Sequence, residues 1–249
     1  MPRYNAVSLS SSYIDVAIFD LDGVLADTTQ AHSAAWKVVF DDLLARTSTA
    51  DQTHRPFDAR SDYLAYVDGR SREDGVRQFL ASRRIVIPER SEDAMVDSVK
   101  TLAARKDALV QVSLQTTSKA LPGAESTLRD LRSTGIKIGV ASSSANCELV
   151  LEVIGLARFV DVRVDGVVAA ELGLPGKPDP ALFLEAAHRL GADPRRAALF
   201  EDALPGVEAG LRGGFAIVVG VDRGNQEIAL RQKGAHAVIR DLTQVTVRA

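Results

Sequence analysis

A strand signal and two carboxylates stand side by side in the stretch VAIFDLDG, at Val16–Gly23. Val16–Phe19 is apolar throughout, as expected of a strand that is buried on both faces of a parallel sheet. Asp20 and Asp22 follow two residues apart, so their side chains can project to the same side. Open α/β sheets bind their ligands at the carboxyl ends of the strands. The stretch therefore predicts a buried strand that ends at a charged site.

Short apolar runs rich in valine and isoleucine recur further along the chain, and amphipathic stretches of helical length separate most of them. These runs are Ile136–Val140, Phe159–Val164, Ala198–Phe200, Ala216–Val221 and Ala237–Ile239. Strands that alternate with helices indicate right-handed βαβ units. We therefore expect an α/β fold whose core is a doubly wound, Rossmann-like parallel sheet.

This alternation breaks between about residues 34 and 116, where helical patterns follow one another without a convincing strand. The expected helices are Ala34–Arg46, Ser61–Val67, Arg72–Arg83 and a long one, Ser91–Leu114, with a surface loop at Thr47–Arg60. Apolar residues at three- and four-residue steps support them. We predict an all-helical cap domain, residues 29–116, inserted into a core made of residues 1–28 and 117–249. Ala26–Thr29 and Gln115–Lys119 are expected to pair as a two-stranded hinge.

The composition excludes several classes of protein. The chain has 249 residues, of which 46% are hydrophobic, and a formal net charge of -3, without the basic clustering that nucleic-acid binding needs. Cys147 is the only cysteine, so no disulfide can form within the chain. No apolar run reaches the roughly 18 to 20 residues of a membrane span, and Met1–Ser12 is a polar tail without the apolar segment of a signal peptide. We expect a cytoplasmic protein that binds neither nucleic acid nor membrane.

A second polar segment, GVASSSAN at Gly139–Asn146, again runs from a strand into a helix start. Exposed N–H groups and hydroxyls at such a position bind anions such as phosphate. Ser142, Ser144 and Asn146 are therefore candidate phosphate ligands. Serine runs are also common helix caps, and capping alone remains an equal explanation.

Two further segments contribute charges. Lys177 stands in the rigid turn GKPDP, at Gly176–Pro180, and Glu201 and Asp202 follow the strand signal at Ala198–Phe200. A point cation suits a phosphoryl group, although a surface lysine without a role is the commoner meaning of such a residue. Carboxylates are the hard oxygen ligands of Mg²⁺, and closely spaced carboxylates repel one another unless a cation or a shared proton lies between them.

The order of these segments, Asp-x-Asp, Ser, Lys and Glu-Asp, resembles the haloacid dehalogenase superfamily of aspartyl-phosphate phosphotransferases over essentially the whole chain. True dehalogenases use a single aspartate, so the second one points to the branches that transfer phosphoryl groups. The resemblance implies that Asp20 is the nucleophile and Asp22 the general acid and base. It also implies phosphate ligands and ligands for Mg²⁺: Ser142 and Lys177 for the phosphoryl oxygens, and Asp20, Asp22 (through its backbone carbonyl), Glu201 and Asp202 for the metal.

Finer residues resemble the β-phosphoglucomutase subfamily. Thr28, His32 and Trp36 follow the first motif at the spacing of that subfamily, and DGRSREDG at Asp68–Gly75 resembles its substrate-specificity segment. The resemblance implies catalytic roles for Thr28 and His32, with His32 assisting the general acid. A buried helix histidine without a role is the open alternative. Trp36 fits the cap core better than a platform for a sugar.

The arginines of the cap segment are the candidate anchors of a second phosphate. A guanidinium can bind two phosphate oxygens at once, and the resemblance implies that Arg72 holds the non-reacting phosphate of a bisphosphate, with Arg70 and Ser71 beside it. The basic stretch Arg70–Arg84 is interleaved with acidic residues, so a solvated helix face remains the other explanation.

The resemblance implies a Mg²⁺-dependent isomerase that interconverts β-glucose 1-phosphate and glucose 6-phosphate through an aspartyl-phosphate and a sugar bisphosphate. We expect it to work as a monomer. Asp68, Gly75 and Ala145 depart from the subfamily pattern and leave the identity of the sugar open. A sugar-phosphate phosphatase with the same aspartyl chemistry is an alternative, because only the exclusion of water separates the two functions. A regulatory phospho-acceptor domain of the receiver type is another, although it would have no use for a cap.

Overall fold

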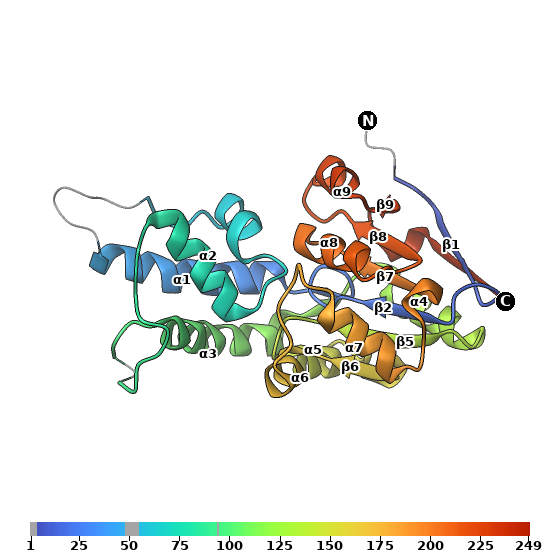
Figure 1. The fold of residues 1–249 in the computed structure, drawn as a ribbon, viewed down its shortest axis with the longest axis horizontal. Helices are drawn as coiled ribbons and strands as arrows, with labels where there is room; N and C mark the ends of the chain where they lie inside the picture. The colour runs from blue at the N-terminus through green and yellow to red at the C-terminus, as the bar shows by residue number, and fades with distance from the viewer. Residues whose placement is uncertain (1–3, 48–54, 94) are drawn as a thin grey trace. The chain divides into compact units, whose positions relative to one another are not determined.

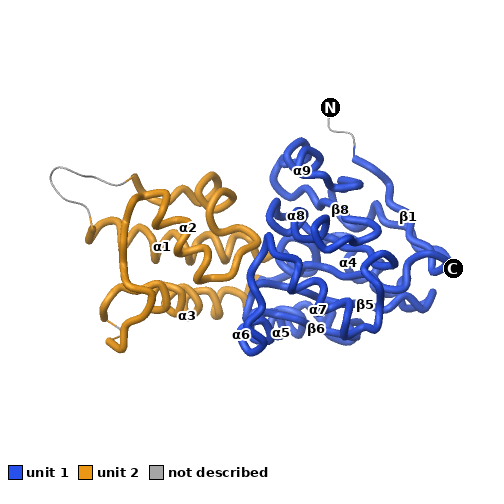
Figure 2. Tube along the Cα trace, viewed as in Figure 1, with its two compact units in different colours: residues 1–27, 118–249 blue, residues 28–117 orange. Residues whose placement is uncertain are grey.

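The computed structural model describes residues 4–47, 55–93 and 95–249. The chain forms two compact units (Figure 2). The core unit consists of Met1–Asp27 and Ser118–Ala249, and the cap unit is Thr28–Thr117.

A six-stranded parallel sheet forms the centre of the core unit, in the order β6-β5-β2-β7-β8-β9 (Figure 1). Its strands are β2 (Val16–Phe19), β5 (Lys137–Ala141), β6 (Val162–Val164), β7 (Ala197–Glu201), β8 (Ile217–Val221) and β9 (Ala237–Ile239). The predicted doubly wound α/β class is confirmed. β6 is shorter than the predicted Phe159–Val164, because Ala157–Phe159 forms a 3₁₀ turn.

Helices connect these strands and cover the sheet. They are α4 (Ala124–Ser133), α5 (Cys147–Val153), α6 (Gly166–Leu172), α7 (Ala181–Arg189), α8 (Leu204–Arg212) and α9 (Glu227–Lys233). On one face, Ile18 and Leu199 of the central strands belong to the same buried cluster as Phe183 of α7 and Val207 of α8. All four side chains are fully buried. Burial of large apolar side chains is the main stabilising contribution to such a fold.

The cap unit is built from α1 (Thr29–Thr47), a π-helical turn (Tyr63–Val67), α2 (Arg72–Arg83) and α3 (Val99–Thr117). Its core is aromatic: the Phe40 ring centroid lies 4.8 Å from that of Trp36 and 4.0 Å from that of Phe79. Trp36 is thus part of the cap core, as expected. The prediction of a surface loop at Thr47–Arg60 is wrong at Phe57, which is 1% exposed and packs on Phe40 and Phe79. Residues 48–54 of that loop lie outside the described residues.

Two helix starts differ from the prediction. α1 begins at Thr29 instead of Ala34. The long helix predicted at Ser91–Leu114 begins only at Val99 and continues to Thr117; residue 94 of the predicted range is not described. The reason is a reciprocal cap at Ser98, whose hydroxyl accepts from the Thr101 N–H, while the Thr101 hydroxyl accepts from the Ser98 N–H. Such a pair satisfies the free N–H groups that a helix start leaves.

The hinge is shorter than expected. β3 (Ala26–Asp27) pairs antiparallel with β4 (Lys119–Ala120), and Gln115–Thr117, predicted as part of the second hinge strand, belongs to α3.

The prediction of a loose tail at Met1–Ser12 is wrong in the part of it that the structure describes. β1 (Val7–Ser10) pairs in parallel with β10 (Val245–Arg248). Val7 and Leu9 are buried, whereas Ser8 is exposed, and this alternation is what a half-buried strand requires. Residues 1–3 of the predicted tail lie outside the described range. No helix among the described residues has the length and the apolar character needed to cross a bilayer.

Candidate active site

The carboxyl ends of two neighbouring strands, β2 and β7, bring predicted acidic residues together. Phe19 and Phe200 are partners in the register of these strands, and their rings stack with centroids 4.7 Å apart. Asp20 directly follows β2 and Glu201 is the last residue of β7, so the two residues are neighbours. Asp20 continues the ladder by donating its N–H to the Phe200 carbonyl at 2.9 Å.

Lys177 lies between these two carboxylates, and we call Asp20, Lys177 and Glu201 the lysine triad. Lys177 Nζ donates to Asp20 Oδ1 at 2.7 Å and to Glu201 Oε1 at 2.5 Å. The side chains of Lys177 and Glu201 are fully buried, and that of Asp20 is 8% exposed. The fold thus brings together groups that are 157 positions apart in the chain. Lys177 is not the solvated surface lysine of the alternative explanation.

The charges of the triad shift one another's proton affinity. Burial raises the pKa of Asp20 well above its ordinary value; Lys177 opposes this, and Glu201 and Asp22 raise it further. Burial alone would lower the pKa of Lys177, but the Asp20 and Glu201 carboxylates outweigh it and raise that pKa. The lysine is therefore a permanent cation among carboxylates that outnumber it.

A tight turn after β2 holds the second aspartate near the first. The Gly23 N–H donates to the Ala26 carbonyl at 2.9 Å, and the Ala26 N–H donates to the Leu21 carbonyl at 2.9 Å. Gly23 has a φ of 80°, a left-handed backbone conformation that is strained for residues with a side chain. A Cβ atom at Gly23 would lie only 1.8 Å from Asp202 Oδ2. Asp202 therefore packs directly against the turn that carries Asp22.

The donor set of Asp20, Asp22, Glu201 and Asp202 fits a hard divalent cation. It is rich in carboxylates, and the positive charge of Lys177 alone does not balance their negative charge. Within residues 4–47, 55–93 and 95–249, no three acidic, histidine or cysteine side chains already converge as ligands of one ion. Mg²⁺ does not need such a cage, since it is held by one or two carboxylates together with water and substrate phosphate.

The predicted phosphate loop follows β5. Ser142 is buried, and its hydroxyl accepts from the Ser144 N–H at 3.1 Å. The Ser144 hydroxyl in turn accepts from the Asn146 N–H at 3.2 Å, and Asn146 precedes the first residue of α5. The two hydroxyls thus shape their own loop, and as donors they remain able to bind an anion.

His32 and Thr28 lie in the cap unit, where both are buried. His32 Nδ1 lies 2.7 Å from the Nζ of Lys106, a residue that the sequence analysis missed. Lys106 is 2% exposed. A signal was available, because Lys106 occupies an apolar face of α3 together with Leu102 and Val110. A lysine in such a stripe breaks the amphipathic pattern.

The predicted phosphate anchors of the cap have partners of their own. Ser71 caps α2: its hydroxyl accepts from the Asp74 N–H at 3.2 Å and donates to the Asp74 carboxylate at 2.8 Å. Arg72, the first residue of that helix, forms an ion pair with Asp107 of α3. Arg70 lies just before the cap residue and is half-buried.

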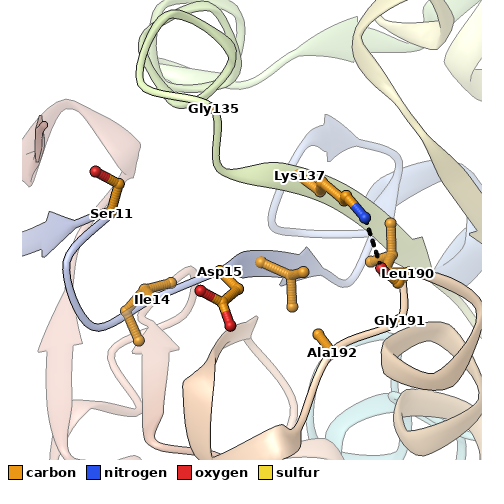
Figure 3. A pocket seen from close by; sticks show the side chains of 9 residues that line it. Ser11, Ile14, Asp15, Gly135, Lys137, Leu190, Gly191 and Ala192 are labelled. Atoms are coloured by element: carbon orange, nitrogen blue, oxygen red, sulfur yellow. Dashed lines mark hydrogen bonds between the residues drawn. The ribbon is translucent and has the colours of Figure 1, made fainter.

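A cavity of about 290 Å³ lies elsewhere in the core unit (Figure 3). Asp15 and Lys137 line it, beside the amino ends of β2 and β5, and Lys137 Nζ donates to the Leu190 carbonyl at 2.9 Å. Asp20 and Asp22 follow the carboxyl end of β2, and the predicted phosphate loop follows the carboxyl end of β5. The cavity is therefore separate from the lysine triad.

Comparison with known proteins shows the family of this chain. Residues 14–214 match the haloacid dehalogenase-like hydrolase family. A β-phosphoglucomutase of Mycobacterium bovis is 44% identical over 239 residues, which cover 93% of this chain and 91% of the relative. A β-phosphoglucomutase of Bacillus subtilis is 33% identical over 236 residues, covering 92% of this chain and 91% of the relative.

A solved structure shows the same likeness in three dimensions. The crystal structure of β-phosphoglucomutase from Clostridium difficile matches with a TM-score of 0.71 at 28% identity, and the match covers 93% of this chain and 92% of that one. This chain therefore belongs to the haloacid dehalogenase-like hydrolase family, and it is similar over almost its whole length to the β-phosphoglucomutases within that family.

Proposed function

We propose that the protein is a β-phosphoglucomutase, which interconverts β-glucose 1-phosphate and glucose 6-phosphate through an aspartyl-phosphate and a sugar bisphosphate. The observation that carries the proposal is the buried lysine triad at the carboxyl ends of β2 and β7. The 44% identity to a β-phosphoglucomutase supports the choice of substrate. A single buried cysteine suits a reducing compartment, and we place the enzyme in the cytoplasm as a monomer.

Asp20 is the nucleophile of the proposed reaction. One of its oxygens is bound to Lys177, and the carboxylate attacks the phosphorus of the incoming phosphate ester. The bond from phosphorus to the bridging oxygen breaks as the aspartyl-phosphate forms. Lys177, with the loop of Ser142, Ser144 and Asn146, binds the phosphoryl oxygens and offsets the repulsion between the carboxylate and a phosphate dianion.

Asp22 handles the proton. It donates one to the departing sugar oxygen in the first half-reaction and removes one from the attacking hydroxyl in the second, as microscopic reversibility requires. Its place on the turn after β2, beside Asp20, suits a group that reaches the bridging oxygen. In the cap, the buried Thr28 and the His32–Lys106 pair are proposed to assist this proton transfer.

Mg²⁺ is the cofactor that this donor set would hold. Asp20, Glu201, Asp202 and the Asp22 carbonyl are the proposed ligands, and the bound ion would neutralise the charge of the phosphoryl group. Glu201 has a second task that needs no metal, because it accepts a hydrogen bond from Lys177. It thereby orients the ammonium group toward Asp20.

Retention of the sugar bisphosphate separates a mutase from a phosphatase. If water reaches the aspartyl-phosphate, the enzyme hydrolyses its substrate, so the site must stay closed while the bisphosphate turns over. We assign Arg72, with Arg70 and Ser71 beside it, to the phosphate that is not reacting. A guanidinium that already pairs with Asp107 is held in place and can still offer further N–H groups to a phosphate.

One assay tests the proposal against its phosphatase alternative. The protein is incubated with Mg²⁺, β-glucose 1-phosphate and a trace of glucose 1,6-bisphosphate, and both glucose 6-phosphate and inorganic phosphate are followed. Glucose 6-phosphate without phosphate release is the expected result, and chelation of the metal by EDTA should stop it. Release of inorganic phosphate alone would establish the phosphatase instead. The absence of both products would reject glucose phosphates as substrates.

A further inference from the structure

We propose that Gly206, in the first turn of α8, is a positioning residue that leaves room for the Glu201 carboxylate and so keeps it on Lys177. The inference rests on the proposed phosphoryl-transfer role of the lysine triad. A Cβ atom at Gly206 would lie 1.8 Å from Glu201 Oε1, 2.1 Å from its Cδ and 2.6 Å from its Cγ. Unbonded carbon atoms pack best at about 3.5 to 4.0 Å. Any side chain at this position would therefore occupy the space of the carboxylate itself.

The carboxylate has little freedom to move aside. Glu201 is 0% exposed, and both of its oxygens are in use. Oε1 accepts from Lys177 Nζ at 2.5 Å, and Oε2 accepts from the Ala203 N–H at 2.7 Å. A shift of the side chain would leave a buried charge or a buried N–H group without its partner, which is costly in a protein interior.

The helix cannot easily move away either. The Ala203 carbonyl accepts from the N–H groups of Gly206 and Val207 at 3.1 and 3.0 Å. The same residue, Ala203, thus starts α8 with its carbonyl and holds Glu201 with its N–H group. Val207 is fully buried in the core. Displacement of the first turn would disturb both contacts at once.

The backbone conformation does not explain the glycine. Gly206 is not among the residues with a left-handed φ, so alanine could adopt its backbone angles. Glycine is, after proline, the poorest helix former, and alanine would favour the helix. Gly23, which faces Asp202 in a similar way, differs because its φ of 80° itself demands glycine. Backbone angles and helix propensity therefore do not account for glycine at position 206. The space that the Glu201 side chain occupies does account for it.

The test is a double-mutant cycle of Gly206→Ala and Glu201→Ala. We expect Gly206→Ala to lower kcat by about 10- to 100-fold, the usual effect of losing a residue that supports a site ligand. It should leave KM for the sugar phosphate nearly unchanged and reduce the rise in Tm that Mg²⁺ produces in the wild-type protein. In the Glu201→Ala background, where the three Glu201 atoms that would overlap the new methyl group are absent, the added methyl group should cost little more.

The matched control is Gly224→Ala. Gly224 also lacks a left-handed φ, and the nearest atom to a Cβ there is Gln226 Nε2, 4.0 Å away. This variant should behave like the wild type in both readouts.

Three results would overturn the proposal. The first is a Gly206→Ala variant with normal kcat and a normal response of Tm to Mg²⁺. The second is an equal loss from Gly206→Ala in both backgrounds, which would mean that the two residues act independently. The third is failure of both Gly206→Ala and the double variant to fold, which would place the need for glycine in helix packing. If only the single variant failed to fold, the rescue by Glu201→Ala would itself support the overlap.

The cycle can be read separately from the proposed function. The response of Tm to Mg²⁺ and the hydrolysis of a small aryl phosphate need no glucose phosphate. A wild-type protein that passes these two measurements but makes no glucose 6-phosphate would contradict the mutase assignment and leave the role of Gly206 to be decided by the cycle.

Discussion

At the scale of single residues, the main feature is one ammonium group that bridges two buried carboxylates. Lys177 Nζ lies within 2.7 Å of both Asp20 and Glu201, and none of these side chains has much contact with solvent. Burial of charges is favourable only when they are paired and hydrogen-bonded. The lysine therefore supports the fold as well as the proposed chemistry.

The nucleophile can be tested by replacing Asp20 with Asn. The amide keeps the shape of the side chain but is a poor nucleophile, so we expect no covalent phosphoenzyme and a loss of activity of several orders of magnitude. Intact-mass measurement after incubation with substrate detects the added phosphoryl group. Asp22→Asn is the comparison, since it should slow both half-reactions and still permit some labelling. Phosphorylation of the Asp20→Asn protein would remove Asp20 from its assigned role.

The contribution of Lys177 to the stability of the fold can be measured with the variant Lys177→Met in the absence of Mg²⁺. Methionine fills a similar volume but leaves Asp20 and Glu201 buried without a cation. Removal of one partner from a buried ion pair costs about 3 to 5 kcal/mol, and we expect a loss of that size in the free energy of unfolding by urea. Lys119→Met, on the exposed strand β4, is the control and should unfold like the wild type. Equal stabilities of all three proteins would show that the triad contributes nothing to the fold.

At the scale of secondary-structure elements, the hydrogen bonds of helix caps determine where a helix begins. In α2, the cap residue Ser71 precedes the predicted first residue Arg72, and the helix has the predicted bounds. In α3, the predicted helix extends back to Ser91, but the observed helix begins only after Ser98. Periodicity predicts that a helix exists, whereas the hydrogen bonds of its first turn determine where it starts.

The cap of α3 can be tested with Ser98→Ala. This change removes the hydroxyl that accepts from the Thr101 N–H at 3.1 Å, and loss of such a cap costs about 1 kcal/mol. We expect a decrease of that size in the free energy of unfolding, measured by urea denaturation. Ser113→Ala, within the same helix, replaces a weaker helix former with a stronger one and should not destabilise the protein. A Ser98→Ala variant as stable as the wild type would argue against the cap.

At the scale of the whole molecule, two strands near opposite ends of the sequence pair with each other. Val7 pairs with Val245 in the two-stranded sheet, and Asn5 exchanges hydrogen bonds with Val238 at the edge strand β9. This covers backbone groups that an edge strand would otherwise leave open to pairing with another chain. The first strand of the chain is thus an integral, hydrogen-bonded element of the core unit.

Leu9→Ala tests this pairing. Leu9 is 0% exposed, and truncation of a buried leucine costs about 2 to 5 kcal/mol. We expect a loss in this range on unfolding in urea. Ser8→Ala, whose side chain points to solvent on the same strand, should be neutral. A loose tail would predict no effect for either variant.

Local pattern is enough to predict the sheet and the family. Continuous apolar runs such as Val16–Phe19 indicate strands that are buried on both faces. Such a run can be recognised without knowledge of the rest of the chain. Asp20, Asp22, Lys177 and the Glu201–Asp202 pair can likewise be picked out in sequence, because each follows a strand or opens a turn. Their order along the chain resembles that of the haloacid dehalogenase superfamily, and this resemblance points to phosphoryl transfer.

Only the folded chain decides which of these groups touch. The contact of Lys177 with Asp20 spans 157 positions, and no local rule gives the distance between side chains so far apart. The same holds for the burial of Phe57 and for the pairing of β1 with β10. Local propensities act over a few residues, whereas these features arise from packing and hydrogen bonding between segments that meet only after the chain has folded. The space that Gly206 leaves for Glu201 belongs to this second group, because a glycine has no side chain to signal what lies against it.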